Sequence, residues 1–379
     1  MKILLISPLP PPIGGIASWT VNLIYYIDNN PSKNKLILCN NSIKGRLITS
    51  QSLIIRLYTG IYNTSKLFLN LRKYIRVNKP TIIHLVSSAS LALIKDCFIV
   101  YIANYHKIPI VLHWHFGRIP TLAKQRNWEW KLLRYIINKS NTSIVIDKKS
   151  YNTLLKEGVS NVINIPNPIS YYAEQKIKIL HDLNSVRQKG RIIFVGHVIK
   201  NKGIFELVEA CVANNSVNEL LIVGPYEEEV KNELSTIANQ RDNGIWLKFI
   251  GQIAQNQVLD LMSKSYILAL PSYTEGFPLV VIEAMAMGCS VIATEVGAIP
   301  EMIDSYSDTP CGICIPIQNA EKLKEAINNL IEDPIKSEIM GKRGIAKVIK
   351  NYTIENIHLQ YLKIWEDALI IINSQNSTN

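Results

Sequence analysis

Short apolar runs recur along the chain and alternate with longer segments whose apolar residues follow helical spacing. The first run, from Lys2 to Ser7, ends in a proline-rich loop, and a helical pattern follows from Ile16 to Ile27. Strands that alternate with helices in this way predict a parallel, doubly wound sheet. The other strands predicted in the first half are residues 36–39, 81–86, 109–114, 143–146 and 162–165.

This alternation pauses between Ser170 and Gly190, a polar and charged stretch without a strong apolar period, and then begins again. The second series predicts strands at residues 191–196, 219–223, 246–250, 266–270 and 290–293. After it, residues 353–372 form a periodic helical pattern that includes Tyr361 and Trp365. A terminal helix after a completed domain is expected to cross back to the first domain.

The two series predict an α/β fold of two Rossmann-like domains that face a central cleft. A chain of 379 residues is also longer than one hydrophobic core usually supports. Ligands bind parallel sheets outside the carboxyl ends of their strands, so we expect the chemistry in that cleft. The predicted boundaries are 1–170 for the N-terminal domain, 171–190 for a linker, 191–352 for the C-terminal domain, and 353–379 for a helix that packs back on the first.

Composition places the chain among globular proteins, with 47% hydrophobic and 19% charged residues. The first apolar run is broken at Pro8, and the run from Leu91 to Ala103 contains Lys95 and Asp96, so neither a signal peptide nor a spanning helix is expected. The 6 cysteines are scattered, which favours reduced thiols and a cytoplasmic location.

Positive charge is concentrated in the first half of the chain. Residues 1–170 carry 22 Lys and Arg against 5 Asp and Glu, whereas the remaining residues carry 19 against 25. Such asymmetry points to an acidic partner for the first half: anionic lipid, nucleic acid or a phosphorylated ligand. Between Lys44 and Lys79, basic and apolar residues alternate with helical spacing, which predicts a surface for an anionic membrane.

The strongest local signal runs from Leu270 to Gly288, where a predicted strand, a loop and a helix follow one another. Pro278 suits the first turn of that helix. Free N–H groups at a helix N-terminus bind anions, so the backbone of this turn is expected to face a diphosphate. The residues of the loop and first turn are Gly276, Phe277, Pro278, Leu279 and Val280.

Two glutamates flank this turn. Glu283 lies one turn beyond Leu279 among apolar residues, where a carboxylate needs hydrogen bonds. The paired hydroxyls of a ribose would supply them. Glu275 stands at the entrance of the helix, where it would reach a sugar beyond the diphosphate.

In the first half, His113 and His115 follow a predicted strand and share one side of it. His113 and His84 are interpreted as structural histidines. Gly14 and Gly15 precede the first helix, and glycine allows close approach of a phosphate. The Gly-x-Gly-x-x-Gly pattern of dehydrogenases is absent from both first loops.

These residues together resemble the retaining glycosyltransferases of family 4, which have the GT-B fold. The resemblance covers nearly the whole chain and depends on an ordered set of motifs. They are Gly14-Gly15, Ile165-Pro-Asn-Pro168, Val195-Gly-His197 with Lys202-Gly203, Glu275-Gly-Phe-Pro278 with Glu283, and Val296-Gly-Ala-Ile-Pro-Glu301.

The resemblance implies roles for individual residues. Glu283 would bind the ribose, Glu275 the transferred sugar, and Lys202 the diphosphate, with Lys200 in support. The family has an arginine where this chain has His197, and a histidine cannot donate the two parallel hydrogen bonds by which a guanidinium binds a phosphate. His115 matches the family histidine near the reacting centre, and Gly14 and Gly15 would lie between diphosphate and acceptor. Neither a cofactor nor a metal is expected.

The implied function is transfer of a sugar, with retention, from a UDP- or GDP-sugar to a glycan hydroxyl, with the acceptor expected to be lipid-linked. The expected setting is capsule or O-antigen synthesis on the inner face of the cytoplasmic membrane. A nucleotide-sugar epimerase or hydrolase of the same fold is the alternative. A nucleic-acid binder is disfavoured because it leaves Lys202, Glu275 and Glu283 unexplained.

Overall fold

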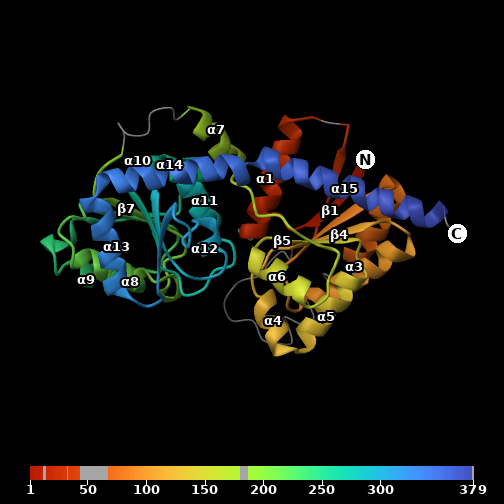
Figure 1. Cartoon of the computed structure of the whole chain (residues 1–379), viewed down its shortest axis with the longest axis horizontal. Coiled ribbons are helices and arrows are strands. Elements are labelled where there is room, and N and C mark those ends of the chain that lie inside the picture. Colours follow the sequence, from red (N-terminus) through yellow and green to blue (C-terminus); the bar gives the residue numbers. More distant parts are fainter. Residues whose placement is uncertain (12–13, 32, 43–66, 180–186, 378–379) are drawn as a thin grey trace. The chain divides into compact units, whose positions relative to one another are not determined.

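The computed structural model describes residues 1–11, 14–31, 33–42, 67–179 and 187–377. The chain divides into two compact units, and each is described by itself (Figure 1). Unit 1 comprises Met1–Asn167 and Glu355–Asn379, and unit 2 comprises Pro168–Ile354. The sequence-based boundary at Ser170 lies close to this division.

Unit 1 is built on a parallel sheet in which six described strands pair in the order β2-β1-β3-β4-β5-β6. All six residues of β3 are buried, as expected for strands covered on both faces. The strands are β1 (Lys2–Ser7), β2 (Lys35–Asn40), β3 (Ile82–Ser87), β4 (Ile110–Trp114), β5 (Thr142–Val145) and β6 (Val162–Asn164).

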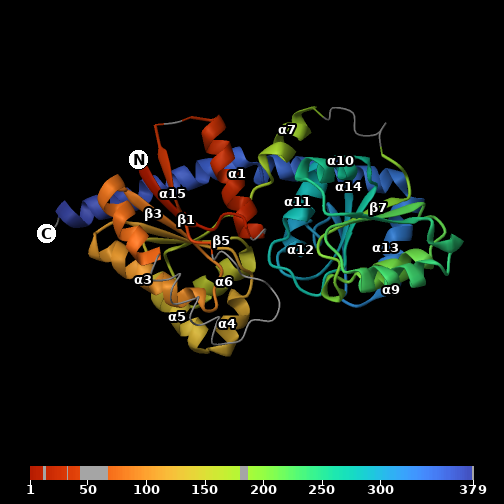
Figure 2. The same ribbon diagram turned by 180° about the vertical axis from the view of Figure 1, so that it is seen from behind.

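Helices cover both faces of this sheet (Figures 1 and 2). One core contains side chains from residues 67–75 and from α3, α4, α5 and α6, whereas the other contains side chains from α1 and α15. Residues 67–78 are helical. The labelled helices are α1 (Gly15–Asn29), α3 (Ala92–Tyr105), α4 (Ile119–Gln125), α5 (Trp128–Asn138), α6 (Lys148–Lys156) and α15 (Ile354–Ser377).

The C-terminal helix belongs to unit 1, which confirms the expected return of the chain. Tyr361 and Trp365 of α15 are buried at 1% exposure each, in the same core as Ile3, Leu5 and Trp19. None of the described helices is both long and apolar enough to cross a membrane.

Unit 2 contains a second parallel sheet, with the strand order β12-β11-β10-β7-β8-β9. This is the order of a doubly wound nucleotide-binding sheet, and its switch point lies between β7 and β10. The fold therefore confirms the predicted pair of Rossmann-like domains. The strands are β7 (Arg191–Val195), β8 (Glu219–Val223), β9 (Leu247–Gly251), β10 (Ile267–Leu270), β11 (Ser290–Thr294) and β12 (Gly312–Ile315).

The strand β12 was missed from sequence because its four residues offer too short an apolar run between Gly312 and Pro316. The labelled helices of unit 2 are α7 (Tyr171–Ile179), α8 (Ile204–Val212), α9 (Glu228–Ala238), α10 (Gln255–Lys264), α11 (Leu279–Ala286), α12 (Ile299–Met302), α13 (Ala320–Glu332) and α14 (Pro334–Asn351), with short 3-10 turns η1 (Lys200–Lys202) and η2 (Asp242–Gly244).

Part of the segment interpreted as a linker is folded. Residues 171–179 form α7, in which Ala173 and Glu174 are buried. The Glu174 carboxylate accepts a hydrogen bond from the Ile354 N–H at 2.7 Å. Because this helix is anchored by a buried carboxylate more than by an apolar stripe, the polar composition concealed it. Residues 180–186 of the segment lie outside the described part of the chain.

Candidate functional site

The loops that follow β7 and β10 leave the sheet of unit 2 at its switch point, where ligands bind in such sheets. A Cβ at Gly203, whose φ is +67°, would lie 2.0 Å from the Pro271 carbonyl oxygen, so this contact requires glycine. Nearby, the Tyr273 N–H donates to the Asn201 carbonyl oxygen at 2.9 Å. These contacts hold η1, and Lys202 at its end, beside the loop that carries Glu275.

Lys202 and Glu275 form an ion pair across these two loops. The lysine Nζ lies 2.6 Å from the Glu275 Oε1, and the side chains are 27% and 12% exposed. From sequence we gave the two residues separate roles, and their separation of 73 positions gave no sign of contact. The pair presents a positive and a negative group together, as recognition of a diphosphate and sugar hydroxyls requires.

A second glycine, Gly297 in the segment after β11, also contacts the loop that carries Glu275. A Cβ at Gly297, where φ is +56°, would meet the Glu275 carbonyl oxygen at 2.3 Å, so a larger residue would displace the loop. The Ala298 N–H donates to the Gly276 carbonyl oxygen at 2.9 Å. The backbone of Glu275 and Gly276 is therefore fixed by the segment after β11.

The helix α11 begins at Leu279, with Pro278 as its N-cap, so the proline stands one residue before the first turn. No side chain caps this end. The Val281 N–H donates to the Pro278 carbonyl oxygen, and Leu279 and Val280 are partly exposed. Phe277 is buried, with its ring centroid 6.1 Å from that of Tyr352. The uncapped end suits an anionic ligand.

Glu283 is buried, at 9% exposure, and its Oε1 accepts a hydrogen bond from Nε2 of Gln255 at 2.6 Å. Burial raises the pKa of Glu283 from 4.5 to about 7, and the Gln255 hydrogen bond opposes this shift. Gln255, the first residue of α10, was not found from sequence because nothing in its local pattern distinguishes it. The carboxyl group therefore titrates near neutral pH.

Two predicted donor-binding residues stand apart from these contacts. The side chains of His197 and Lys200 are exposed, and neither forms a hydrogen bond or ion pair with Lys202, Glu275 or Glu283 among the described contacts. Their assigned roles stay predictions.

In unit 1, Gly14 caps α1 in an extended conformation and Gly15 is its first residue. A Cβ at either position would meet nothing within 4 Å. Neither glycine is thus required by neighbouring atoms of the described protein. The predicted role of Gly14 and Gly15 in the close approach of a ligand stays a prediction.

His115 follows β4 and lies against two aromatic rings. Its ring centroid lies 4.1 Å from that of His113 and 4.9 Å from that of Trp19. The first distance confirms that the two histidines share one side of the strand. Burial lowers the pKa of His115 to about 3, with His84 acting in the same direction. His115 is therefore neutral at pH 7 and offers hydrogen bonds without a formal charge.

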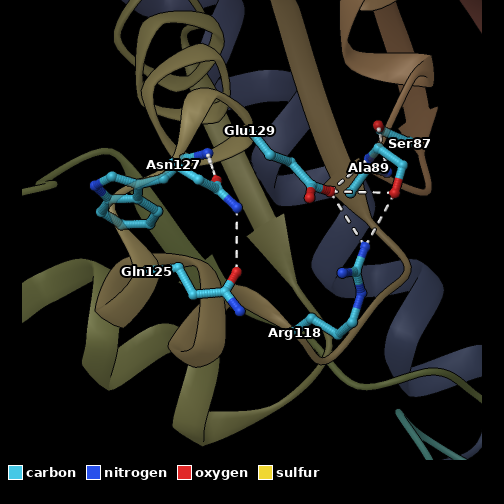
Figure 3. Close-up of polar contacts among 8 residues, drawn as sticks. Ser87, Ala89, Arg118, Gln125, Asn127 and Glu129 are labelled. Atoms are coloured by element: carbon cyan, nitrogen blue, oxygen red, sulfur yellow. Dashed lines mark hydrogen bonds and ion pairs between the residues drawn. The ribbon is translucent and has the colours of Figure 1, made fainter.

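A polar cluster that we did not predict holds the loop between β3 and α3 (Figure 3). The Glu129 carboxylate accepts hydrogen bonds from the Ser90 N–H at 2.7 Å and from Arg118 at 3.2 Å. Ala89 and Ser90 have φ values of 65° and 59°, which are strained for residues with a side chain. The His115 N–H donates to the Ser87 carbonyl oxygen at 2.9 Å, so this loop and His115 are connected.

Within the described ranges, no three His, Cys, Asp or Glu side chains are arranged to hold a metal ion.

Two family profiles match the chain in succession. The profile described as Glycosyltransferase Family 4 matches residues 19–171, and the profile described as Glycosyl transferases group 1 matches residues 175–347. The first corresponds to unit 1 and the second to unit 2.

Individual proteins are also similar to the chain. An uncharacterized 41.2 kDa protein in the cps region of Klebsiella pneumoniae is 26% identical over 324 residues, 83% of this chain and 87% of that protein. The N,N'-diacetylbacillosaminyl-diphospho-undecaprenol alpha-1,3-N-acetylgalactosaminyltransferase of Campylobacter jejuni is 26% identical over 202 residues, 53% of this chain and 51% of that protein. HepE of Anabaena, solved in complex with UDP-glucose, has a TM-score of 0.67 at 18% identity and covers 97% of this chain and 100% of its own, which shows a shared fold.

Proposed function

Because the chain belongs to the glycosyltransferases of the family 4 and group 1 type, with the GT-B fold, we propose that it transfers a sugar from a UDP- or GDP-sugar to a glycan hydroxyl with retention at the anomeric carbon. The observation that carries the proposal is the Lys202–Glu275 pair beside the uncapped N-terminus of α11. In HepE the bound donor is UDP-glucose, which favours a uridine donor.

The proposed reaction needs no protein nucleophile. The acceptor oxygen bonds to the anomeric carbon on the face that the diphosphate leaves, the bond to the leaving phosphate oxygen breaks, and that oxygen takes the acceptor proton. Lys202 and the first N–H groups of α11 would stabilise the negative charge that develops on the diphosphate. Glu275 would accept hydrogen bonds from the sugar, and Glu283 from the ribose.

A thermal-shift panel of UDP-, GDP-, ADP- and CMP-sugars tests the proposed donor class. We expect one UDP- or GDP-sugar to raise the melting temperature selectively, because a ligand at 100 times its Kd stabilises the native state by about 2.7 kcal/mol. Selective stabilisation by a CMP-sugar would contradict the proposal. Complete hydrolysis or isomerisation of the bound donor without an acceptor would support the epimerase or hydrolase alternative instead.

We propose surface-polysaccharide synthesis on the inner face of the cytoplasmic membrane, with a lipid-linked acceptor. The similarity to a protein encoded in a cps region and to a transferase named for a diphospho-undecaprenol substrate favours this setting. Part of the basic segment expected to contact the membrane, residues 43–66, lies outside the described chain. Residues 67–78 form a helix on which Arg72, Lys73 and Arg76 are exposed.

An apolar stripe on α3 supports the membrane proposal. Its members recur every three or four positions, so they share one side of the helix, and each is exposed. Exposed apolar patches on soluble domains mark interaction sites, and aromatic residues beside basic ones suit an anionic bilayer surface. The ring centroid of Phe68, in the helix of residues 67–78, lies 5.4 Å from that of Phe98 on α3. The exposed basic residues of the first helix therefore lie near the apolar stripe of the second. The α3 stripe consists of the N-cap residue Leu91 and of Ile94, Phe98, Tyr101 and Tyr105.

Replacing Phe98 and Tyr101 together by serine is expected to weaken binding to vesicles that contain anionic phospholipid. Removing two aromatic side chains from the interface would reduce the partition coefficient about tenfold or more, measured by vesicle sedimentation. Tyr306→Ser, a change of an exposed tyrosine in unit 2, serves as the control and should bind as the wild type does. Equal binding by all three proteins would overturn this part of the proposal.

A further inference from the structure

A chain of hydrogen bonds runs from the C-terminal helix into the core of unit 1. The Trp365 indole Nε1 donates to Nδ1 of His84 at 3.0 Å. The other ring nitrogen of His84, Nε2, lies 3.3 Å from Nδ1 of His113. Trp365 is 1% exposed and both histidines are 0% exposed, so solvent does not compete for these bonds. Trp365 and His84 are 281 positions apart in sequence.

The donor properties of these groups fix the direction of the chain. An indole nitrogen can only donate, so Nδ1 of His84 must carry a lone pair. His84 is then neutral and has its proton on Nε2, which donates to Nδ1 of His113. His113 is neutral for the same reason, and its proton is on Nε2. Burial, which lowers the pKa of both histidines, acts in the same direction.

The chain ends on a buried N–H group beside His115. Nε2 of His113 has no hydrogen-bond partner among the described residues, and neither does the buried Nε2 of His115. The two rings are 4.1 Å apart between centroids. A buried N–H group without a partner is unfavourable, so this end of the hydrogen-bond chain points to a functional role. From sequence we interpreted His113 as a satisfied structural histidine, whereas only one of its nitrogens is paired.

We propose that Trp365 is a positioning residue that sets the tautomers of His84 and His113 and thereby places the N–H donor of His113 beside His115. This inference rests on the proposed function, because it fixes the polar surroundings of His115, the histidine assigned to the reacting centre.

The packing explains how the helix can enforce this state. Tyr361, one turn before Trp365 on α15, lies 5.8 Å from the His84 ring and 5.6 Å from that of His113. The ring of Trp19, on α1, also packs against His113 and His115, with centroid distances of 5.0 Å and 4.9 Å. The rings therefore have little room to rotate and exchange donor for acceptor.

Nitrogen-15 NMR of histidine-labelled protein tests the tautomers without an activity assay. Two-bond correlations between ring nitrogens and carbon-bound protons should show single neutral tautomers, with the proton on Nε2 of both His84 and His113. Signals are assigned with single substitutions among the 7 histidines. A proton on Nδ1 of His84 or His113, or a mixture of tautomers there, would overturn the hydrogen-bond chain even if the enzyme proves to be a transferase.

The Trp365→Phe substitution tests the role of the hydrogen-bond chain, because it keeps an aromatic ring at this position but removes the indole N–H donor. We expect the single tautomers to be lost and kcat for transfer to fall about tenfold or more, with KM for the donor unchanged. Tyr361→Phe, which removes a hydroxyl from the same buried helix face, should leave both the tautomers and kcat as in the wild type.

The combined readouts separate the possible failures. A Trp365→Phe protein with altered tautomers but wild-type kcat would overturn the positioning role, whereas absence of transfer by the wild type would contradict only the proposed function. If the Trp365→Phe protein does not fold, the tautomer of His84 in the wild type still decides whether the proposed chain of hydrogen bonds exists.

Discussion

Replacing Lys202 by methionine is expected to lower kcat for transfer about 100- to 1,000-fold, the loss that follows removal of one charged donor from a developing negative charge. Methionine keeps the apolar stem but removes the ammonium group that lies 2.6 Å from the Glu275 Oε1. Without it, the Glu275 carboxylate would repel the leaving diphosphate. Steady-state transfer at saturating donor measures the effect.

Lys200 provides the comparison for this variant. It lies in the same turn, but its side chain is exposed. Because exposed charges contribute little, Lys200→Met is expected to lower kcat about fivefold or less. A Lys200 variant as impaired as the Lys202 variant would show that general positive charge, and not the position of Lys202, supports the reaction.

The contact between Lys202 and Glu275 also makes their effects interdependent. Glu275→Gln should mainly slow transfer, and the double variant should lose less than the product of the two single losses, because contacting residues are energetically coupled. Strictly multiplicative losses would mean that the pair does not act as one unit during transfer.

Much of the fold could be predicted from sequence because periodicity is a local property. The apolar runs that end at or near Ser7, Val86 and Leu270 form strands in the structure, as predicted. The periodic segment with Tyr361 and Trp365 forms the C-terminal helix that packs on the first domain. The same local pattern predicted that Glu275 lies in the loop after the strand that ends at Leu270, whereas the order of the strands, which places this loop at the switch point of unit 2, came from the structure.

The contacts within the site could not be predicted in this way. Gln255 reaches Glu283 across 28 positions, and Trp365 reaches His84 across 281, so no local pattern records either contact. The strained backbone at Ser90 was also missed, because its sequence has no glycine to indicate a positive φ. Such features depend on which loops the sheet brings together.

Glu283→Gln is expected to weaken binding of the nucleoside diphosphate about 10- to 100-fold, since hydrogen bonds to a charged group contribute about 1.5–3 kcal/mol. The effect should depend on pH. Because the pKa of Glu283 is raised to about 7, the carboxylate forms as pH rises from about 6 to about 8, and wild-type affinity should increase over that range. The Glu283→Gln protein lacks the titrating group and should show no such increase.

The same pKa sets an opposite trend for the stability of the free protein. A carboxyl group whose pKa rises from 4.5 to about 7 on folding stabilises the protein below pH 4.5, and this contribution is lost as pH rises through about 7. The wild type should therefore lose thermal stability over this range, measured by differential scanning fluorimetry without ligand. Glu283→Gln should reduce that loss.

The most direct measurement is a calorimetric titration at about pH 8, where the Glu283 carboxyl is ionised, with the nucleoside diphosphate that stabilises the protein most. Wild type, Glu283→Gln and a control, Glu228→Gln on the exposed surface of α9, are compared side by side. If the buried carboxylate of α11 binds the ribose of the donor, the first and third proteins will bind equally and the second about 10- to 100-fold more weakly. Equal affinity of all three would contradict the assignment of the donor site to α11.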